Sequence, residues 1–373
     1  MTESESRSAL DGVWEVLVAL CRAAADPAAC AAAAKLIGEG RADLPVLLEQ
    51  AARHRLLPAL GYVLAAEDRG GPDPVPPQLR GELLGALLAN RRRVDRLTRT
   101  AAEVAARLAE AGVRAAVTKG VALEPTVYGG LGVRKMMDAD LMIHPRDRAR
   151  TAEVMTELGF GNGVYDWRAH RIDDLPAAAR AVYRLSPDHL PHFLRLEPDR
   201  GGTLVVDFAN SVTWSASRWQ VPMEQVLDRL DTVSLLGGEL CAPTLAPAWL
   251  FLFTALHLFR ESWFLTTVSA GKDMLYKFAD VLGLWNAQRE LLRTEVPAIV
   301  REHALEPPLA WVTGHTDRVF GTDLTGSLGL DGAAGDTWLA RGEGPGGKEL
   351  TWTGTMRDRL LRRDPATLFQ EAS

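Results

Sequence analysis

Residues Val133–Phe160 read VRKMMDADLMIHPRDRARTAEVMTELGF, and the interpretation of the chain starts from this stretch. Asp138 and Asp140 stand one residue apart where the apolar run 139–144 begins, which is typical of a buried strand. A helix is expected to follow from Pro145. Residues i and i+2 of a strand point to the same side, so we expect both carboxylates on one face, roughly 7 Å apart at the backbone.

These paired acids predict a cation site. Two ionised carboxylates in one small space repel each other unless a cation lies between them. Oxygen ligands without a neighbouring His or Cys suit Mg²⁺ or Mn²⁺. A third acid, Asp207, ends the apolar run 204–206, where an adjacent strand would bring it to the same edge. We expect Asp138, Asp140 and Asp207 to bind the metal; the plainer alternative is a pair of solvent-facing aspartates.

Residues suited to phosphate precede the aspartates. Thr118-Lys119-Gly120 lies at an expected turn between a strand at 113–119 and a short helix at 121–128. Free backbone N–H groups and the helix dipole attract phosphate at such a turn. Lys119 adds a cation, and the guanidinium of Arg134 offers a forked donor to a triphosphate. We therefore predict that Lys119, Gly120 and Arg134 bind a nucleotide.

Composition limits the class of protein and its partners. A chain of 373 residues with 47% hydrophobic and 24% charged residues is typical of a globular protein with a sizeable core. The net charge of −6 argues against nucleic acid as a partner, because such binding needs a basic surface. The three cysteines have no metal-type spacing. The N-terminus has no basic region before its short apolar stretch, and 245–259 is too short to span a bilayer, so we expect a cytoplasmic protein without a membrane partner.

The predicted fold class is α+β. Apolar residues recur at helical spacing over most of the first 111 residues, which predicts an N-terminal helical region at 1–111 that includes a bundle. A small mixed β-sheet core is expected at 112–243, with strands near 192–196 and 203–208 and a hairpin around Gly237-Gly238. A C-terminal helical region follows at 244–328. The segment 329–373 is expected to be a glycine-rich loop and a terminal helix.

The order of these motifs resembles a known family. A strand, Lys119-Gly120, a short helix, Tyr-Gly, Arg134, Asp-Ala-Asp-Leu-Met-Ile and a later Val-Val-Asp are similar to the poorly characterised bacterial nucleotidyltransferase family within the DNA polymerase beta-like superfamily. The likeness is clearest over Val113–Phe160 and extends more weakly to Asp280. It implies a nucleotidyltransferase core in which the three aspartates bind two divalent ions and Gly120 holds the phosphates. It also implies a place for His192 and Asp280 towards the acceptor.

The resemblance implies an enzyme: a Mg²⁺-dependent, pyrophosphate-releasing nucleotidyltransferase. Its expected reaction moves a nucleoside monophosphate, AMP from ATP in the simplest case, to a small-molecule, peptide or protein acceptor. The chain departs from the family in two places. Val121 stands where the broader superfamily has a Ser or Gly, and Asp207-Phe208-Ala209-Asn210 replaces an Asp-Leu-His-Trp sequence.

Two other functions are considered. Ala209 favours a catalytically silent member of the family that binds a peptide or protein. A third possible function is that of a toxin-like transferase acting on tRNA, which the acidic net charge opposes.

Other charged residues and histidines have simpler structural interpretations. His189 and His192 are more typical of a surface turn than of a zinc pair. The alternating charges of Lys272, Asp273, Lys277 and Asp280 are typical of a solvated helix face, although Asp280 has a counterpart in the family.

Overall fold

A computed structural model describes residues 3–66, 75–185, 190–197, 202–214 and 217–372. Its contacts divide the chain into two compact units. Unit 1 contains residues 1–91, 127–135 and 254–373, and unit 2 contains residues 92–126 and 136–253. Each unit thus joins segments that are distant in sequence, whereas the sequence predicted four consecutive regions. In the described ranges no helix is both long and apolar enough to cross a membrane.

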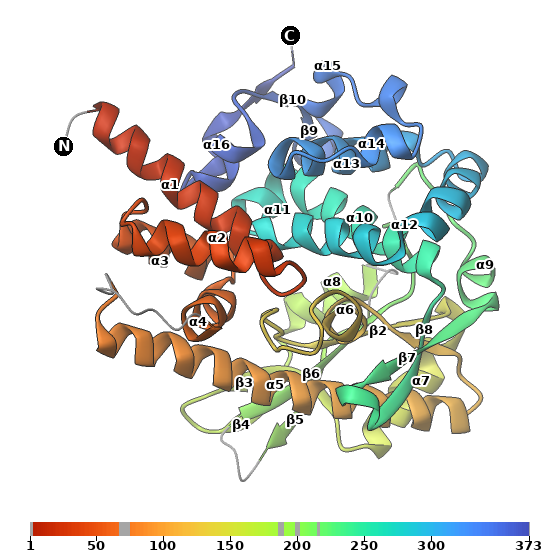
Figure 1. The fold of residues 1–373 in the computed structure, drawn as a ribbon. Coiled ribbons are helices and arrows are strands. Elements are labelled where there is room, and N and C mark those ends of the chain that lie inside the picture. The colour runs from red at the N-terminus through yellow and green to blue at the C-terminus, as the bar shows by residue number, and fades with distance from the viewer. Residues whose placement is uncertain (1–2, 67–74, 186–189, 198–201, 215–216, 373) are drawn as a thin grey trace. The chain divides into compact units, whose positions relative to one another are not determined.

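Unit 2 is built on a mixed sheet, as the predicted α+β class requires (Figure 1). Among the described residues its eight strands run in the order β4-β3-β5-β6-β2-β1-β8-β7. Their bounds are β1 Ala115–Val117, β2 Ala139–Ile143, β3 Gly161–Asp166, β4 Arg171–Asp174, β5 Phe193–Glu197, β6 Gly202–Ala209, β7 Leu230–Leu235 and β8 Leu240–Leu245. The helical segments that connect them are α6 Lys119–Val127, η1 Pro145–Asp147, α7 Arg148–Glu157, α8 Ala177–Leu185, α9 Met223–Asp228 and η2 Leu236–Gly238.

The centre of this sheet consists of β1, β2 and β6. Strand β2 is buried along its whole length, which accounts for its apolar residues; Asp140 is the one charged residue in it. It pairs antiparallel with β1 and parallel with β6. The predicted hairpin is confirmed: β7 and β8 pair antiparallel, and Gly237 and Gly238 in the connection have positive φ angles of 68° and 97°. The pair β3 and β4 was not predicted from the sequence.

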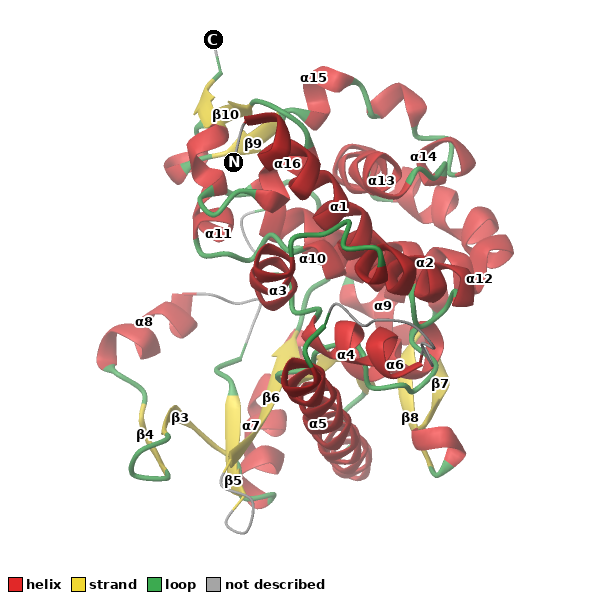
Figure 2. Cartoon of the chain, turned by 60° about the vertical axis from the view of Figure 1, so that its left-hand side comes forward, coloured by secondary structure: helices red, strands yellow, loops and turns green. Residues whose placement is uncertain are grey.

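Unit 1 is mainly helical (Figure 2). The predicted N-terminal bundle is present as α1 Glu3–Arg22, α2 Pro27–Gly38, α3 Leu44–Arg53 and α4 Leu57–Ala66. Two long helices, α5 Pro77–Glu110 and α10 Pro247–Trp263, contribute residues to both units. The remaining helices are α11 Leu265–Ser269, α12 Leu275–Glu302, α13 Glu306–Phe320, α14 Leu324–Ser327, η3 Asp331–Ala333, α15 Asp336–Leu339, η4 Pro345–Gly347, α16 Met356–Leu361 and η5 Pro365–Leu368.

The expectation of a glycine-rich loop near the C-terminus is wrong. Within the described part of the chain, β9 Arg341–Glu343, β10 Glu349–Trp352 and β11 Phe369–Glu371 form an antiparallel sheet in the order β11-β10-β9. Tertiary packing orders this segment. The ring of Trp338 lies 4.8 Å from that of Trp263, and its Nε1–H donates to the Pro307 carbonyl at 2.8 Å. Composition alone cannot show such contacts.

Lys272 is exposed as expected, but the solvated face is wrong for Asp273, Lys277 and Asp280, because these three side chains are buried. Asp273 is 4% exposed, and its carboxylate accepts from the fully buried guanidinium of Arg359 at 2.7 Å and from the Ser262 hydroxyl at 2.6 Å. Asp280 is 2% exposed. Charges that alternate along a helix therefore mark internal ion pairs in this unit. His189 lies outside the described residues.

The Asp273–Arg359 pair predicts a large effect on stability. Asp273→Ala leaves a buried guanidinium without its counter-ion, so we expect the free energy of unfolding to fall by about 3–5 kcal/mol. The measurement is urea-induced unfolding followed by circular dichroism. Glu49→Ala is the matched control, because Glu49 forms a two-bond pair with the exposed Arg363. The control should lose much less stability, because exposed ion pairs contribute little; equal losses would contradict the prediction.

Candidate active site

The three predicted metal-binding aspartates belong to two adjacent strands of unit 2. Asp140 in β2 is the direct register partner of Asp207 in the parallel strand β6. Asp138 lies two positions before Asp140, immediately ahead of β2. Residues opposite each other on paired strands point to the same face of a sheet. The fold therefore brings Asp207 beside Asp140, although 66 residues separate them in the sequence.

Lys119 is the first residue of α6, where the chain turns from β1 into the helix. Its φ angle of 42° is in the left-handed region, which a non-glycine residue rarely adopts. The preceding residue anchors the turn, because the Thr118 backbone N–H and hydroxyl both donate to the Asp140 carbonyl, at 2.9 and 3.2 Å. Gly120, expected to form the phosphate turn, is buried in the first turn of α6 and lacks a positive φ. Lys119, and not Gly120, therefore has the unusual backbone conformation at this position.

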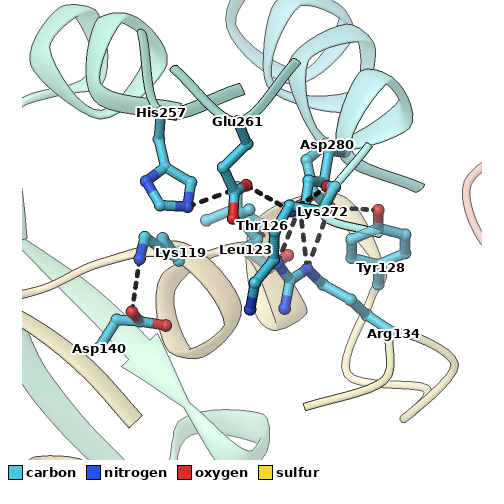
Figure 3. Close-up of polar contacts among 11 residues, drawn as sticks. Lys119, Leu123, Thr126, Tyr128, Arg134, Asp140, His257, Glu261, Lys272 and Asp280 are labelled. Atoms are coloured by element: carbon cyan, nitrogen blue, oxygen red, sulfur yellow. Dashed lines mark hydrogen bonds and ion pairs between the residues drawn. The ribbon is translucent and has the colours of Figure 1, made fainter. Parts of the chain in front are cut away.

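An ion pair joins this turn to the strand. The Lys119 ammonium donates to Asp140 Oδ1 at 2.6 Å, and Figure 3 shows this contact. The side chains of Lys119 and Asp140 are 15% and 12% exposed. The ammonium also lies 5.7 Å from the ring centre of Phe253. Burial lowers the pKa of Lys119, but Asp140, Asp207 and Asp138 together raise it further, so the net shift is upward and the amine stays charged.

The negative charges of Asp138 and Asp207 are less well neutralised than that of Asp140. Burial and the neighbouring Asp140 raise the pKa of Asp138 from 3.8 to about 6. Asp207 is 8% exposed, and its Oδ1 is buried without a hydrogen-bond partner. His192 directly precedes β5, and its Nε2 lies 3.6 Å from this oxygen. Three carboxylates thus surround one ammonium, which is a local excess of negative charge.

The side chains at this site are of the kind that binds a divalent cation. It consists of carboxylate oxygens, and the Asp207 Oδ1 is an acceptor with an open bonding position. In the described part of the chain, however, no group of three or more His, Cys, Asp or Glu side chains is arranged so that it could hold a metal ion. The Lys119 ammonium contacts Asp140 instead. A divalent ion at Asp140 would therefore have to replace the ammonium.

Arg134 was predicted to bind the nucleotide, and Asp280 was predicted to lie towards the acceptor. In the structure these two residues contact each other in unit 1 (Figure 3). Arg134 makes two hydrogen bonds to Asp280 Oδ2, from Nη2 at 2.8 Å and from Nε at 3.2 Å, and a third from Nε to Oδ1 at 3.0 Å. The Tyr128 hydroxyl donates to Asp280 Oδ1 at 2.6 Å. Burial lowers the pKa of Arg134, but Asp280 raises it more, so the net shift is upward. The pair holds the segment 127–135 to α12.

Sequence reasoning missed three of these relationships. It did not predict that Lys119 contacts Asp140, that Phe253 lies beside the ammonium, or that Tyr128 donates to Asp280. The Tyr-Gly pair was quoted only as part of the family pattern. A buried lysine next to a turn is a signal for an internal ion pair only when its burial is known. The sequence alone does not reveal that burial.

A known family covers the part of the chain that contains these residues. The profile of a family described as "Uncharacterised nucleotidyltransferase" matches residues 41–321, about three quarters of the chain. The matched region includes both aspartate strands and the Lys119 turn. No curated protein matches the chain.

We predict that the substitution Asp138→Asn makes the folded protein more stable. Its folded pKa of about 6 lies above the ordinary 3.8, so the folded state favours the protonated acid. That contribution is complete below about pH 4 and is lost as the pH rises through about 6. In metal-free buffer at pH 7, Asp138→Asn should raise the free energy of unfolding by about 1–2 kcal/mol, after allowance for its partial exposure. Urea unfolding at pH 4.5 and 7 measures this; a less stable variant at pH 7 would refute it.

We predict that substitution of Lys119 makes the folded protein less stable. Lys119→Met removes the counter-ion of the buried carboxylates, so we expect a loss of about 2–4 kcal/mol in the free energy of unfolding at pH 7. Thermal unfolding at pH 7 and 4.5 checks the cause, because protonation of the acids should restore part of the loss. Lys35→Met is the control: Lys35 pairs with Glu39 on the surface and should change stability by less than about 0.5 kcal/mol.

Proposed function

The chain belongs to the uncharacterised nucleotidyltransferase family, and on that premise we propose that it transfers AMP from ATP to an acceptor. The acceptor is a hydroxyl or a carboxylate-type oxygen on a small molecule, a peptide or a protein. The observation that carries the proposal is the register pairing of Asp140 with Asp207, together with Asp138 two residues before the first of them. Three carboxylates at one edge of a sheet are suited to divalent-ion chemistry.

The three aspartates would hold the metal, and Asp207 has a second part in the proposed reaction. Asp138, Asp140 and Asp207 would hold Mg²⁺ or Mn²⁺, which would lower the pKa of the acceptor hydroxyl and neutralise the triphosphate oxygens. Asp207 is the base, because its Oδ1 has no hydrogen-bond partner and can take the hydroxyl proton. The acceptor oxygen then bonds to the α-phosphorus, the bond from that phosphorus to the bridging oxygen breaks, and pyrophosphate leaves with the electron pair.

Lys119 supplies positive charge for the leaving group. An ammonium beside the departing pyrophosphate stabilises charge that grows in the transition state. Its present partner is Asp140, so substrate binding exchanges one anionic partner for another. The flexible lysine side chain suits such an exchange. Arg134 has no part in the proposed reaction, because its charge is already paired with Asp280.

A catalytically silent binding module is the second candidate. Two observations favour it: the ammonium contacts the aspartate that a metal would need, and Ala209 stands on the same face of β6 as Asp207, where the family has a histidine. Calorimetry with a non-hydrolysable ATP analogue and Mg²⁺ distinguishes the two. Saturable binding that needs the metal supports the enzyme, and no binding supports the module.

The enzyme proposal predicts a severe loss in each aspartate variant. With [α-³²P]ATP and Mg²⁺, Asp140→Asn and Asp207→Asn should lower the transfer of labelled AMP at least about 10³-fold, because each removes a charged ligand. Circular dichroism should show an unchanged fold. Asp174→Asn, an exposed acid in β4, is the control and should keep full activity. Full activity in either site variant would refute the role.

The label also tests the acceptor class. Incubation with small molecules, with protein and with total RNA shows which fraction becomes radioactive. Label in a small molecule or a protein agrees with the proposal. Label in RNA alone would instead favour the tRNA-modifying alternative.

A further inference from the structure

The ammonium of Lys119 occupies the position at which the aspartates of unit 2 would hold a cation. It donates to Asp140 Oδ1 at 2.6 Å, so no ion fits between the two groups (Figure 3). Asp207 and Asp138 also raise the pKa of this amine, so its charge is shared among three carboxylates and not confined to its hydrogen-bond partner. A divalent ion therefore competes with a cation that the chain itself supplies.

The backbone is fixed on both sides of this ion pair. The Thr118 N–H and hydroxyl donate to the Asp140 carbonyl at 2.9 and 3.2 Å, and Lys119 begins α6 with a φ angle of 42°. Rotations of the Lys119 side chain are therefore sufficient to separate the ammonium from the carboxylate. Such a separation is a local event that leaves β2 and α6 in place.

The ammonium needs a new partner if it leaves Asp140. The Lys119 side chain is 15% exposed, and burial is the largest single effect on its pKa, which it lowers towards the uncharged amine. Away from the carboxylate the ammonium would be a buried charge without a counter-ion, which is strongly unfavourable. A free divalent ion brings no anion for it. Such an ion must also give up bound water to enter the site, which Mg²⁺ does reluctantly.

A triphosphate supplies the missing partner. Phosphate oxygens form strong charge-assisted hydrogen bonds with an ammonium. Lys119 can therefore exchange Asp140 for a phosphate oxygen and remain paired, and Asp140 then accepts the cation that arrives with the nucleotide. The exchange also removes the positive charge from among the three carboxylates, which increases their affinity for a divalent ion.

On the premise of the nucleotidyl transfer proposed above, we propose that Lys119 makes this site selective for a complex of metal and triphosphate over the free metal ion. Lys119 is then a specificity-determining residue, in addition to its part in stabilising the leaving group. Metal and triphosphate bind cooperatively, and linkage requires each to raise the protein's affinity for the other by the same factor.

Calorimetry on the full chain at pH 7 tests the proposal with three probes: Mn²⁺ alone, a non-hydrolysable ATP analogue alone, and an equimolar mixture of the two. For the wild type we expect a Kd above about 1 mM for Mn²⁺ alone. The mixture should bind at least about tenfold more tightly than either component, which is within the usual range of coupling between two ligands. Electron paramagnetic resonance gives the concentration of hydrated Mn²⁺ as an independent measure.

Variants assign the selectivity to the ammonium. Lys119→Met should bind Mn²⁺ alone at least about tenfold more tightly than the wild type, and Mn²⁺ should raise the Tm of this variant alone. Lys119→Gln keeps a hydrogen-bond donor for Asp140 without the charge, and the same results are expected of it if Lys119→Met does not fold. Adding Asp207→Asn to either variant should abolish the gain. Lys35→Met, which removes a surface lysine paired with Glu39, should behave as the wild type does.

The results distinguish this selectivity from the proposed reaction. Binding of Mn²⁺ alone by the wild type, with the same affinity as Lys119→Gln, would overturn the selectivity, whereas wild-type binding of the mixture would still support nucleotidyl transfer. If neither the analogue nor the mixture binds, the proposed reaction is refuted and the selectivity with it. Mn²⁺ bound by Lys119→Met but not by the wild type, together with wild-type binding of the mixture, would establish the role of Lys119.

Discussion

The site in unit 2 depends on one electrostatic constraint: two carboxylates stand side by side on adjacent parallel strands. Asp140 and Asp207 are register partners, and each is less than 10% exposed. Such a pair is unfavourable without positive charge nearby. Lys119 provides that charge from a turn whose backbone is held in the left-handed region. A strained residue that persists in a structure requires support from its surroundings, and here the Thr118 bonds and the ion pair provide it.

The two units differ in how they neutralise buried charge. In unit 1 each buried acid has a matched guanidinium: Asp273 pairs with Arg359, and Asp280 pairs with Arg134. In unit 2 three carboxylates share one ammonium, and one of their oxygens has no hydrogen-bond partner. Matched pairs are sufficient to explain a structural role. The unmatched cluster still attracts a cation, which is why we associate the chemistry with unit 2 and not with the equally buried charges of unit 1.

The sequence predicted much of unit 2, for identifiable reasons. Strand β2 is apolar apart from Asp140, and the hairpin has a Gly-Gly connection, so local pattern and structure agree there. The C-terminal sheet was missed because its glycine-rich sequence has no strand periodicity, and contacts such as Trp338 with Trp263 order it. The left-handed conformation of Lys119 and its contact with Asp140 were not predicted, because neither has a local sequence signal.

The sequence by itself determined which side chains are available: a pair of aspartates at the start of an apolar strand, a third at the end of another, and a lysine before a glycine. Residue spacing along one strand is a local property, so the pairing of Asp138 with Asp140 could be argued without a structure. Only the tertiary structure decided that Asp207 is the register partner of Asp140, that Lys119 contacts Asp140, and that Arg134 contacts Asp280. Those partners lie 67, 21 and 146 positions apart in the sequence. The strand register and burial that bring them together arise from packing across the whole unit.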